Sequence, residues 1–258
     1  IDECLLKDIR IIDGLGLFPE RTKRLLGTKE IVSTNYNDIE KPLDDVVTFV
    51  IPVRIDSSER QANLDVVLDQ LSKRTHTKII ILEADSGPLY KMPENYPNVT
   101  YLFVKDDNPI FYRTKYLNEL LRQADTSIVG IWDTDVLLPK EQILEAVDAI
   151  RKGNAVMSFP YDGRFYMLPQ EDSLLLKKRE MNMEECCQKI YEYVLAHGPN
   201  SVGGAFLVNK NVYIKYGGEN QHFYGWGPED AERCKRMEIL GLPIYRAQGP
   251  LLHLFHPR

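Results

Sequence analysis

The stretch IWDTDVLLP, residues 131–139, runs an apolar strand pattern directly into two carboxylates, Asp133 and Asp135. An ionised carboxylate at the end of a buried strand is costly unless a cation or a proton relay uses it. The two acids are two residues apart, so an extended backbone directs both side chains to one side. We therefore predict a divalent-cation site here. The alternative is a solvated turn in which Asp135 precedes the helix that follows Pro139.

The segments before this stretch alternate between strand and helix patterns. VVTFVIPV, residues 46–53, is apolar on both faces, which is typical of a central parallel strand. Ser58 and Gln61 resemble a capping box at the start of a helix. The apolar stripe of that helix consists of Leu64, Val67, Leu68 and Leu71. Further strands are predicted at 78–83, 99–104 and 127–132, and a helix is marked by Tyr116, Leu117, Leu120 and Leu121.

The alternation continues after Pro139 and defines the fold class. We predict a helix that stops at Gly153, with an apolar stripe of Ile143, Leu144, Val147 and Ile150, and a strand at 155–159. Residues 160–200 are less regular, with a helix ending near Ala196. The remaining elements are a strand at 205–208, a helix over 228–240, and short strands near Ile244 and Leu251. This order predicts an α/β domain over 46–258, with a mostly parallel central sheet flanked by helices. Residues 1–45 are predicted to be an extension packed on it.

Composition and charge exclude several classes of protein. The chain has 258 residues, 43% hydrophobic and 27% charged, which suffices for a full core. A net charge of -6 without a long Lys or Arg block argues against nucleic acid as a partner. No apolar run approaches the ~20 residues of a membrane span, and the start lacks a secretory signal pattern. Four cysteines without CxxC spacing indicate reduced thiols. We therefore expect a cytoplasmic protein, with peripheral association at the inner face of a membrane left open.

Candidate binding residues collect where the predicted strands end. In open α/β sheets, ligands bind beyond the carboxyl ends of the strands. Arg54, Glu83, Asp85, Asp133 and Asp135 all fall there. Their shared location indicates a common site more strongly than any one of these residues does.

The chain closes with LLHLFHPR, residues 251–258, which contains His253 and His256. An imidazole beside hard carboxylate oxygens suits Mn²⁺ or a similar first-row ion. The alternative is that each histidine is an ordinary core residue, which is the commoner role of a histidine in an apolar stretch.

FYGWGPEDAER, residues 223–233, combines glycines, an aromatic pair and adjacent acids. Pro228 suits a first helical turn, so Glu229 and Asp230 lie near a helix N-terminus, where the dipole favours their ionised forms. Such a carboxylate can accept a proton. Trp226 and Tyr224 resemble a stacking surface for a sugar ring, although core packing explains Tyr224 equally well. In SVGGAF, residues 201–206, two glycines allow close approach of a ligand, or simply a turn.

These motifs occur in a specific order: FVIPVR, ILEAD, FYR, WDTD, GGAFLV, FYGWGPEDAER and the histidine pair. In this order the chain resembles metal-dependent glycosyltransferases of the GT-A fold. The first half is similar to family 2 glycosyltransferases. The second half resembles the β-1,4-galactosyltransferases, the polypeptide N-acetylgalactosaminyltransferases and the bacterial chondroitin polymerases. The resemblance covers the chain from about Val46 onward, and implies a nucleotide-binding half at 46–159 and an acceptor and metal half at 160–258.

The resemblance implies roles for individual residues on the donor side. A UDP-sugar would be bound by a uridine pocket of Pro52, Val53, Arg54, Glu83 and Asp85. Arg113 would hold the nucleotide or its phosphates. Asp133 would lie near the ribose and the metal. The ligands of Mn²⁺, or of Mg²⁺, would be Asp135, His256, His253 and Asp133.

The resemblance also implies an acceptor side. Gly204, Tyr224 and Trp226 would contact the donor or acceptor sugar. Glu229 would bind the acceptor, and Asp230 would remove its proton. Retaining relatives have Asn where this chain has Asp230, which favours the inverting branch. The implied reaction moves a hexose or N-acetylhexosamine from UDP to a saccharide hydroxyl. The donor could be Gal, GalNAc, GlcNAc or GlcA.

Two other functions remain open at this stage. A sugar nucleotidyltransferase shares the α/β half and the paired carboxylates, but IPVRIDSSER, residues 51–60, has no Gly-rich phosphate loop. A non-catalytic carbohydrate-binding domain could keep the fold, but the intact acids at 133, 135 and 230 argue for turnover.

Overall fold

The computed structural model describes residues 47–257 except 76, 94–95, 197 and 226. The predicted extension at 1–45 lies outside the described residues. Each helix among these residues is either too short or too polar to span a membrane.

The first half of the domain follows the predicted alternation closely. Its elements are β1 (Val47–Val53), α3 (Ser58–Thr75), β2 (Lys78–Asp85), β3 (Val99–Lys105), α4 (Arg113–Gln123), β4 (Ile128–Trp132), β5 (Val136–Leu137), α5 (Lys140–Arg151) and β6 (Met157–Phe159). Every residue of β1 is buried, as its two apolar faces predict. Within α5, Leu144 is 38% exposed, so the predicted apolar stripe of this helix is narrower than expected.

The second half contains β7 (Phe165–Met167), α6 (Gln170–Lys178), α7 (Met183–Gln188), η2 (Ile190–Glu192), β8 (Val194–Leu195), η3 (Gly198–Asn200), β9 (Ala205–Asn209), α8 (Lys210–Lys215), α9 (Glu229–Ile239), β10 (Ile244–Arg246) and β11 (Leu251–His253). The predicted helix ending near Ala196 is wrong, because the chain there forms the short strand β8. The predicted capping box at Ser58 is also wrong. Ser57 Oγ accepts the N–H of Arg60 at 3.2 Å instead.

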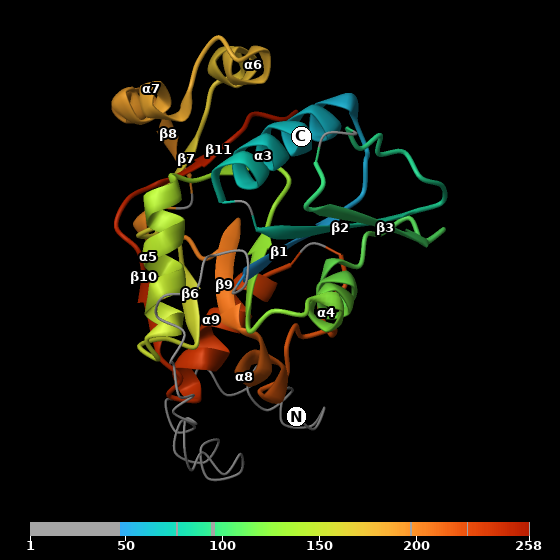
Figure 1. The fold of residues 1–258 in the computed structure, drawn as a ribbon, viewed down its shortest axis with the longest axis vertical. Coiled ribbons are helices and arrows are strands. Elements are labelled where there is room, and N and C mark those ends of the chain that lie inside the picture. Colours follow the sequence, from blue (N-terminus) through green and yellow to red (C-terminus); the bar gives the residue numbers. More distant parts are fainter. Residues whose placement is uncertain (1–46, 76, 94–95, 197, 226, 258) are drawn as a thin grey trace.

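A seven-stranded sheet forms the centre, in the order β10-β6-β9-β4-β1-β2-β3. All its neighbouring strands are parallel except β9, which runs antiparallel to β4 and β6. Helix α4 packs on β1 and β2, and α5 packs on β6, β9 and β10. Figure 1 shows these helices beside the sheet. The predicted fold class, α/β with a mostly parallel central sheet flanked by helices, is confirmed.

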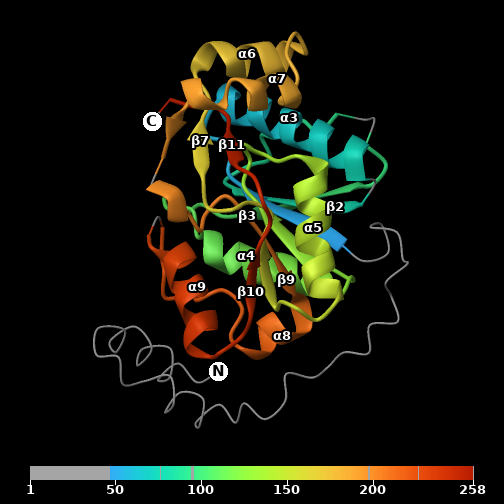
Figure 2. The same cartoon turned by 90° about the vertical axis from the view of Figure 1, so that its left-hand side faces the viewer.

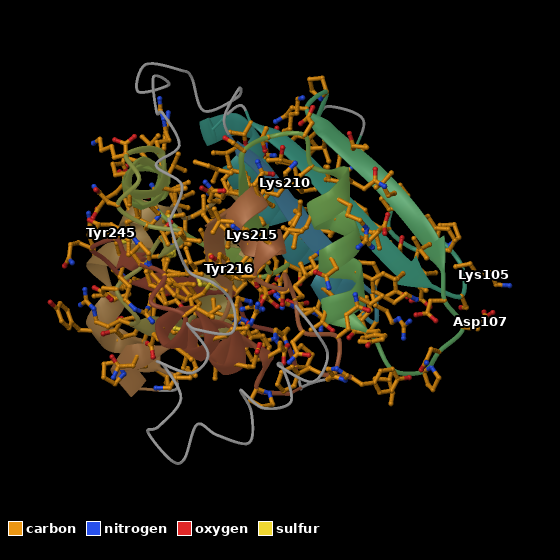
Figure 3. All side chains as sticks on the ribbon, turned by 90° about the horizontal axis from the view of Figure 1, so that it is seen from below. Lys105, Asp107, Lys210, Lys215, Tyr216 and Tyr245 are labelled. Carbon is orange, nitrogen blue, oxygen red and sulfur yellow. The ribbon has the colours of Figure 1, made fainter. Side chains whose placement is uncertain are left out.

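The two edges of this sheet carry polar groups. Seen from below, Lys105 and Asp107 lie at one side of the molecule and Tyr245 at the other (Figure 3). Lys105 and Asp107 form an exposed ion pair at 3.6 Å beside edge strand β3. The hydroxyl of Tyr245, on edge strand β10, donates to Glu145 at 2.7 Å. Charged and hydrogen-bonded side chains at an edge discourage pairing with a further strand.

A second sheet, ordered β5-β11-β7-β8, joins the C-terminus to the middle of the chain. Strand β11 pairs antiparallel with β5, and His253 is opposite Val136. The N–H of Leu254 also donates to the carbonyl of Asp135 at 2.8 Å. Helices α6 and α7 lie together beyond this sheet, at the end of the molecule next to α3 (Figures 1 and 2). The pairing of β5 with β11 therefore sets the C-terminal histidines against the acids that follow β4.

Candidate active site

One pocket, of about 540 Å³, lies where the predicted binding residues meet. Ten of the predicted site residues line it: Pro52, Val53, Arg54, Arg113, Asp133, Asp135, Glu229, Asp230, His253 and His256. They come from the ends of β1 and β4, from the starts of α4 and α9, and from the C-terminus. Residues far apart in the sequence thus share one cavity at the carboxyl end of the parallel strands, as the sheet topology predicts.

Asp135, His253 and His256 form the only group of three or more potential metal ligands among the described residues. One ligand atom from each residue lies within 4.8 Å of the other two. Nε2 of His253 is 3.2 Å from Oδ1 of Asp135, and Nε2 of His256 is 3.6 Å from Oδ2. Both imidazoles thus present their Nε2 atoms to the same carboxylate. We call these three candidate ligands the metal triad.

The electrostatics of the metal triad fit a cation. Burial raises the pKa of Asp135, but the charges of His253, His256 and Arg60 outweigh it and hold this pKa below its usual range. Burial lowers the pKa of His253, but Asp135 and Asp133 outweigh it and raise this pKa. The Asp135 carboxylate is therefore ionised and attracts a positive charge. Either a proton on a neighbouring histidine or a divalent ion can supply that charge. One carboxylate with two imidazoles suits Mn²⁺ or another first-row ion.

Asp133 lies outside the metal triad and is held by Arg113. Nη2 of Arg113 is 2.6 Å from Oδ1 of Asp133, and the Asp133 N–H donates to the carbonyl of Gly204 at 2.9 Å. Burial raises the pKa of Asp133, and the charge of Arg113 only partly offsets this. Arg113 also carries a buried Nη1 without a hydrogen-bond partner. This nitrogen belongs to a residue that lines the pocket, so it can serve an anionic ligand there.

The predicted acid pair occupies the first turn of α9, with Pro228 as the residue before the helix. Glu229 is buried, and its Oε2 has no hydrogen-bond partner. Burial and the neighbouring charge of Asp230 raise the pKa of Glu229, which corrects the expectation that the dipole favours its ionised form. Burial also raises the pKa of Asp230, but Arg233 and Arg113 outweigh it and hold this pKa below its usual range. The two adjacent carboxyls therefore differ in environment: the pKa of Glu229 is raised and the pKa of Asp230 is lowered.

The wall formed by the end of β1 differs in part from the predicted uridine pocket. Arg54 lines the cavity, with Nη1 bonded to the carbonyl of Asn108 at 2.7 Å and the guanidinium 5.5 Å from the ring centre of Phe111. Glu83 and Asp85 do not line it. Asp85 pairs with Nε of Arg54 at 3.8 Å and accepts the N–H of Ser86.

Glu83 is fully buried behind that wall. Its carboxylate accepts the N–H groups of Leu89 and Tyr90 and the hydroxyl of Tyr101. Because β2 continues to Asp85, Glu83 lies inside the strand rather than beyond its end. Glu83 therefore fixes the loop after β2, and it is not among the residues that line the pocket.

Of the residues predicted to contact the donor or acceptor sugar, Glu229 lines this pocket, whereas Gly204 and Tyr224 do not. Gly204 has a φ of 84°, and a Cβ there would lie 3.1 Å from Leu251, Phe165 and Val136. Tyr224 is half exposed, packs edge-on against Tyr112, and bonds to Asn108. Trp226 lies outside the described residues. Gly204 is thus explained by close packing between the two sheets.

Five of the residues that line the pocket were not among the predicted site residues: Asp56, Arg60, Pro109, Phe111 and Thr134. Arg60, in the first turn of α3, is 2.9 Å from Asp56 and donates to Thr134 at 3.4 Å. Asp56, Arg60 and Thr134 all line the cavity. Arg60 could have been predicted, because it lies in the first turn of the helix that follows β1 and therefore at the carboxyl end of the sheet.

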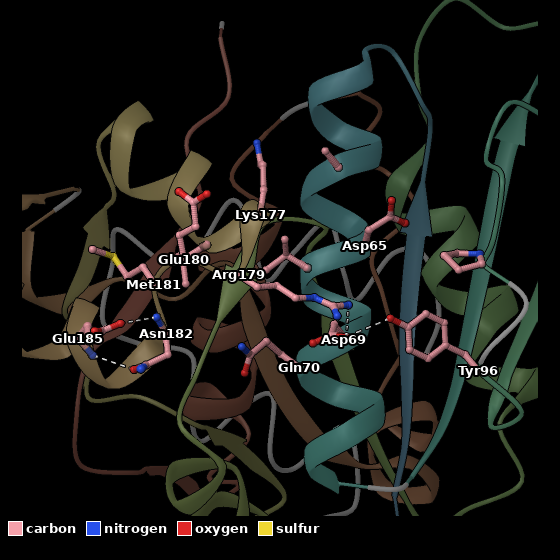
Figure 4. Close-up of a pocket in the computed structure, with 14 residues that line it drawn as sticks. Asp65, Asp69, Gln70, Tyr96, Lys177, Arg179, Glu180, Met181, Asn182 and Glu185 are labelled. Carbon is pink, nitrogen blue, oxygen red and sulfur yellow. Dashed lines mark hydrogen bonds and ion pairs between the residues drawn. The ribbon is translucent and has the colours of Figure 1, made fainter.

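A second and larger pocket, of about 670 Å³, lies between α3 and residues 176–185 (Figure 4). Asp69 accepts hydrogen bonds there from Tyr96 at 3.3 Å and from Arg179 at 3.2 Å. This second pocket contains none of the predicted site residues. Asp69 and Arg179 form an ion pair within this second pocket, whereas Lys177 pairs with Glu59, which does not line it.

Part of this chain is similar to known galactosyltransferases. Residues 190–257, which include the acid pair and both histidines, match a family model described as the N-terminal domain of galactosyltransferase. β-1,4-Galactosyltransferase 7 of mouse and of human are each 38% identical to this chain over 55 residues. That match spans 21% of this chain and 17% of each relative. The predicted resemblance to galactosyltransferases is thus confirmed, on matches to part of the chain.

Two solved structures are similar at low sequence identity. The catalytic domain of Drosophila β-1,4-galactosyltransferase 7, solved with xylobiose, has a TM-score of 0.45 and 18% identity, covering 78% of this chain and 64% of that one. Glucosyl-3-phosphoglycerate synthase from Mycobacterium tuberculosis, solved with Mn²⁺, UDP and phosphoglyceric acid, has a TM-score of 0.49 and 13% identity, covering 83% and 74%.

Proposed function

We propose that this chain is a metal-dependent, inverting glycosyltransferase that moves a hexose or N-acetylhexosamine from a UDP-sugar to a saccharide hydroxyl. One observation carries the proposal: a single cavity contains both the metal triad and the acid pair Glu229 and Asp230. In sugar transfer from a diphosphate, a cation can stabilise the leaving group and a carboxylate can take the proton of the acceptor hydroxyl. The C-terminal sequence match supports the same reaction class.

The donor would bind on the side of the cavity formed by β1, α4 and the metal triad. Asp135, His253 and His256 would hold a divalent ion, which as a Lewis acid neutralises charge on the departing diphosphate. Arg113 is positioned to add a second positive charge, because its buried Nη1 has no hydrogen-bond partner. Pro52, Val53 and Arg54 would form the floor for the nucleoside. The leaving group then departs as an anion and needs no proton.

The acceptor would bind at the start of α9. Glu229 offers a buried oxygen without a partner, which can accept a hydrogen bond from a sugar hydroxyl. Asp230 has a pKa below its usual range, so it is ionised near neutral pH. It would take the proton of the attacking hydroxyl as the new bond to the anomeric carbon forms. Attack from the side opposite the diphosphate inverts that carbon.

The test is to incubate the protein with Mn²⁺ and each of a panel of UDP-sugars, with and without saccharide acceptors. We expect UDP release that depends on an acceptor and stops when the metal is chelated. The anomeric configuration of the product, read by NMR, checks inversion. Pyrophosphate release would instead indicate a nucleotidyltransferase, and saccharide binding without any turnover would indicate a non-catalytic domain. Either result contradicts the proposal.

A further inference from the structure

Asp230 makes its charged contacts through one of its two carboxylate oxygens. Nη1 of Arg233 lies 2.7 Å from Oδ1, and Nη1 of Arg113 lies 4.0 Å from the same atom. Oδ2 instead lies close to the loop before β9. A Cβ added to Gly203 would stand 2.9 Å from Oδ2. The two oxygens of the carboxylate are therefore distinguishable, one held by arginine and one beside a glycine.

Arg233 is itself fixed on several sides. It is fully buried, and its Nε and Nη2 donate to Glu219 at 3.0 and 2.8 Å. The guanidinium carbon lies 4.1 Å from the ring centre of Phe206, on β9. Glu219 is in turn buried, and it accepts the hydroxyl of Tyr213 at 2.7 Å. An arginine with this many partners has little freedom to rotate, so it holds Asp230 in one orientation.

The loop that faces Oδ2 is also anchored. The hydroxyl of Tyr161 donates to the carbonyl of Gly203 at 2.7 Å. Nη1 of Arg246 donates to the carbonyl of Ser201 at 3.1 Å, and its guanidinium lies over Phe159 at 4.3 Å. Both contacts tie this loop to the central sheet. The space beside Oδ2 thus depends on Gly203 having no side chain.

We propose that Arg233 is a positioning residue that holds Asp230 by Oδ1, so that Oδ2, beside Gly203, is the atom that takes the acceptor proton. Glu219 serves as the buried counter-charge that keeps Arg233 in place. This inference rests on the proposed function. The inference adds to the proposed function the atom that accepts the proton and the side chains that orient that atom.

The test compares Arg233→Met with Arg236→Met. Arg236 is also fully buried on α9, but it contacts Glu232 and the carbonyls of Tyr216 and Gly218 rather than Asp230. Rates are expressed per UDP-binding site, which removes any unfolded fraction. We expect R233M to lower kcat about 10- to 100-fold with little change in the KM for the donor, since a small misplacement of a reacting group costs this much. R236M should keep most of the wild-type kcat per site.

Two further variants make the test robust. Arg233→Lys keeps the positive charge but lacks the forked guanidinium group. This variant should therefore recover part of the turnover that R233M loses. If R233M does not fold, Glu219→Gln combined with R233M removes both buried charges and leaves Asp230 equally unsupported. Gly203→Ala should lower kcat independently, because its Cβ would crowd Oδ2.

Wild-type kcat in folded R233M or in the double variant would overturn the inference, as would equal losses of kcat in R233M and R236M. Wild-type kcat in G203A would overturn the assignment of Oδ2. If the wild-type protein itself transfers no sugar, the proposed function fails instead, and the two failures are thereby distinguished.

Discussion

Nε2 of His253 lies 3.2 Å from Oδ1 of Asp135, although one residue is in the middle of the chain and the other near its end. The antiparallel pairing of β5 with β11 produces this contact, because His253 is opposite Val136, the residue after Asp135. Backbone pairing within a sheet therefore sets the position of His253, by strand register, and His256 follows three residues beyond the end of β11.

Replacing a histidine of the metal triad should remove metal binding without unfolding the domain. We expect His256→Ala to weaken Mn²⁺ binding by at least about 100-fold, since even outer-sphere partners of metal ligands contribute 10- to 100-fold. Titration calorimetry with Mn²⁺ measures the affinity. His222 is exposed and outside the triad, so His222→Ala is the matched control and should bind Mn²⁺ like the wild type. Unchanged Mn²⁺ affinity in H256A would exclude the triad as the metal site.

The two acids at the start of α9 should have separable kinetic effects. We expect Asp230→Asn to lower kcat by roughly 10²- to 10⁴-fold, the usual contribution of a general base. Binding of UDP with Mn²⁺ should persist, because Asp230 is not part of the metal triad. Glu229→Gln should mainly raise the KM for the saccharide, because Glu229 is proposed to bind the acceptor rather than to take its proton. Steady-state kinetics with each substrate varied checks both, and near-normal kcat in D230N would contradict its role as the base.

Strand and helix positions in the first half were largely predictable from sequence, because burial there follows simple periods. The fully buried β1 and the apolar face of α4 are examples. The segment 160–200 was less predictable. Helix α7 ends at Gln188 rather than near Ala196, and Val194 and Leu195 are apolar yet exposed on the edge strand β8. No helix was predicted over α6, where Leu174 and Leu175 are not buried.

The site was predictable only in part, for a physical reason. Acids at strand ends and the C-terminal histidines stand out as residue types, and the resemblance supplied their roles. The contacts of Arg233 with Glu219 and Asp230 depend on how α9 packs against the turn after α8. Nothing in the local sequence distinguishes Arg233 from a solvent-facing arginine on an acidic helix.

The buried pair of Glu219 and Arg233 should make stability depend on pH. Burial raises the pKa of Glu219, but the charge and hydrogen bonds of Arg233 outweigh it, so this pKa is below its usual range in the folded protein. A lowered pKa means that the stabilisation is present above the unfolded-state value of about 4.3 and is lost as the pH falls through the lower, folded-state value. Urea unfolding between pH 3 and 7 measures this loss.

Glu219→Gln tests the same pair directly. It leaves Arg233 as a buried charge with fewer partners, so we expect the free energy of unfolding at pH 7 to fall by about 3–5 kcal/mol. The difference from the wild type should shrink toward low pH, where Glu219 is protonated. Glu119→Gln is the control, because Glu119 pairs with Arg122 on the surface of α4 and should contribute less than about 1 kcal/mol. If the two variants lowered the free energy of unfolding equally, the buried position of the Glu219–Arg233 pair would not explain its contribution to stability.

A glycine in the middle of the sheet should resist substitution for a steric reason. Gly130 lies in β4, and a Cβ there would stand 2.5 Å from Cδ1 of Phe49 in β1. The ring of Phe49 also packs edge-on against Trp132 at 5.1 Å, so it has little room to move. We expect Gly130→Ala to lower the free energy of unfolding by about 1–3 kcal/mol through overpacking. Gly87→Ala, whose Cβ would meet nothing within 4 Å, should change it by less than about 0.5 kcal/mol. Thermal unfolding followed by circular dichroism distinguishes them, and equal melting temperatures would show that Phe49 can move aside.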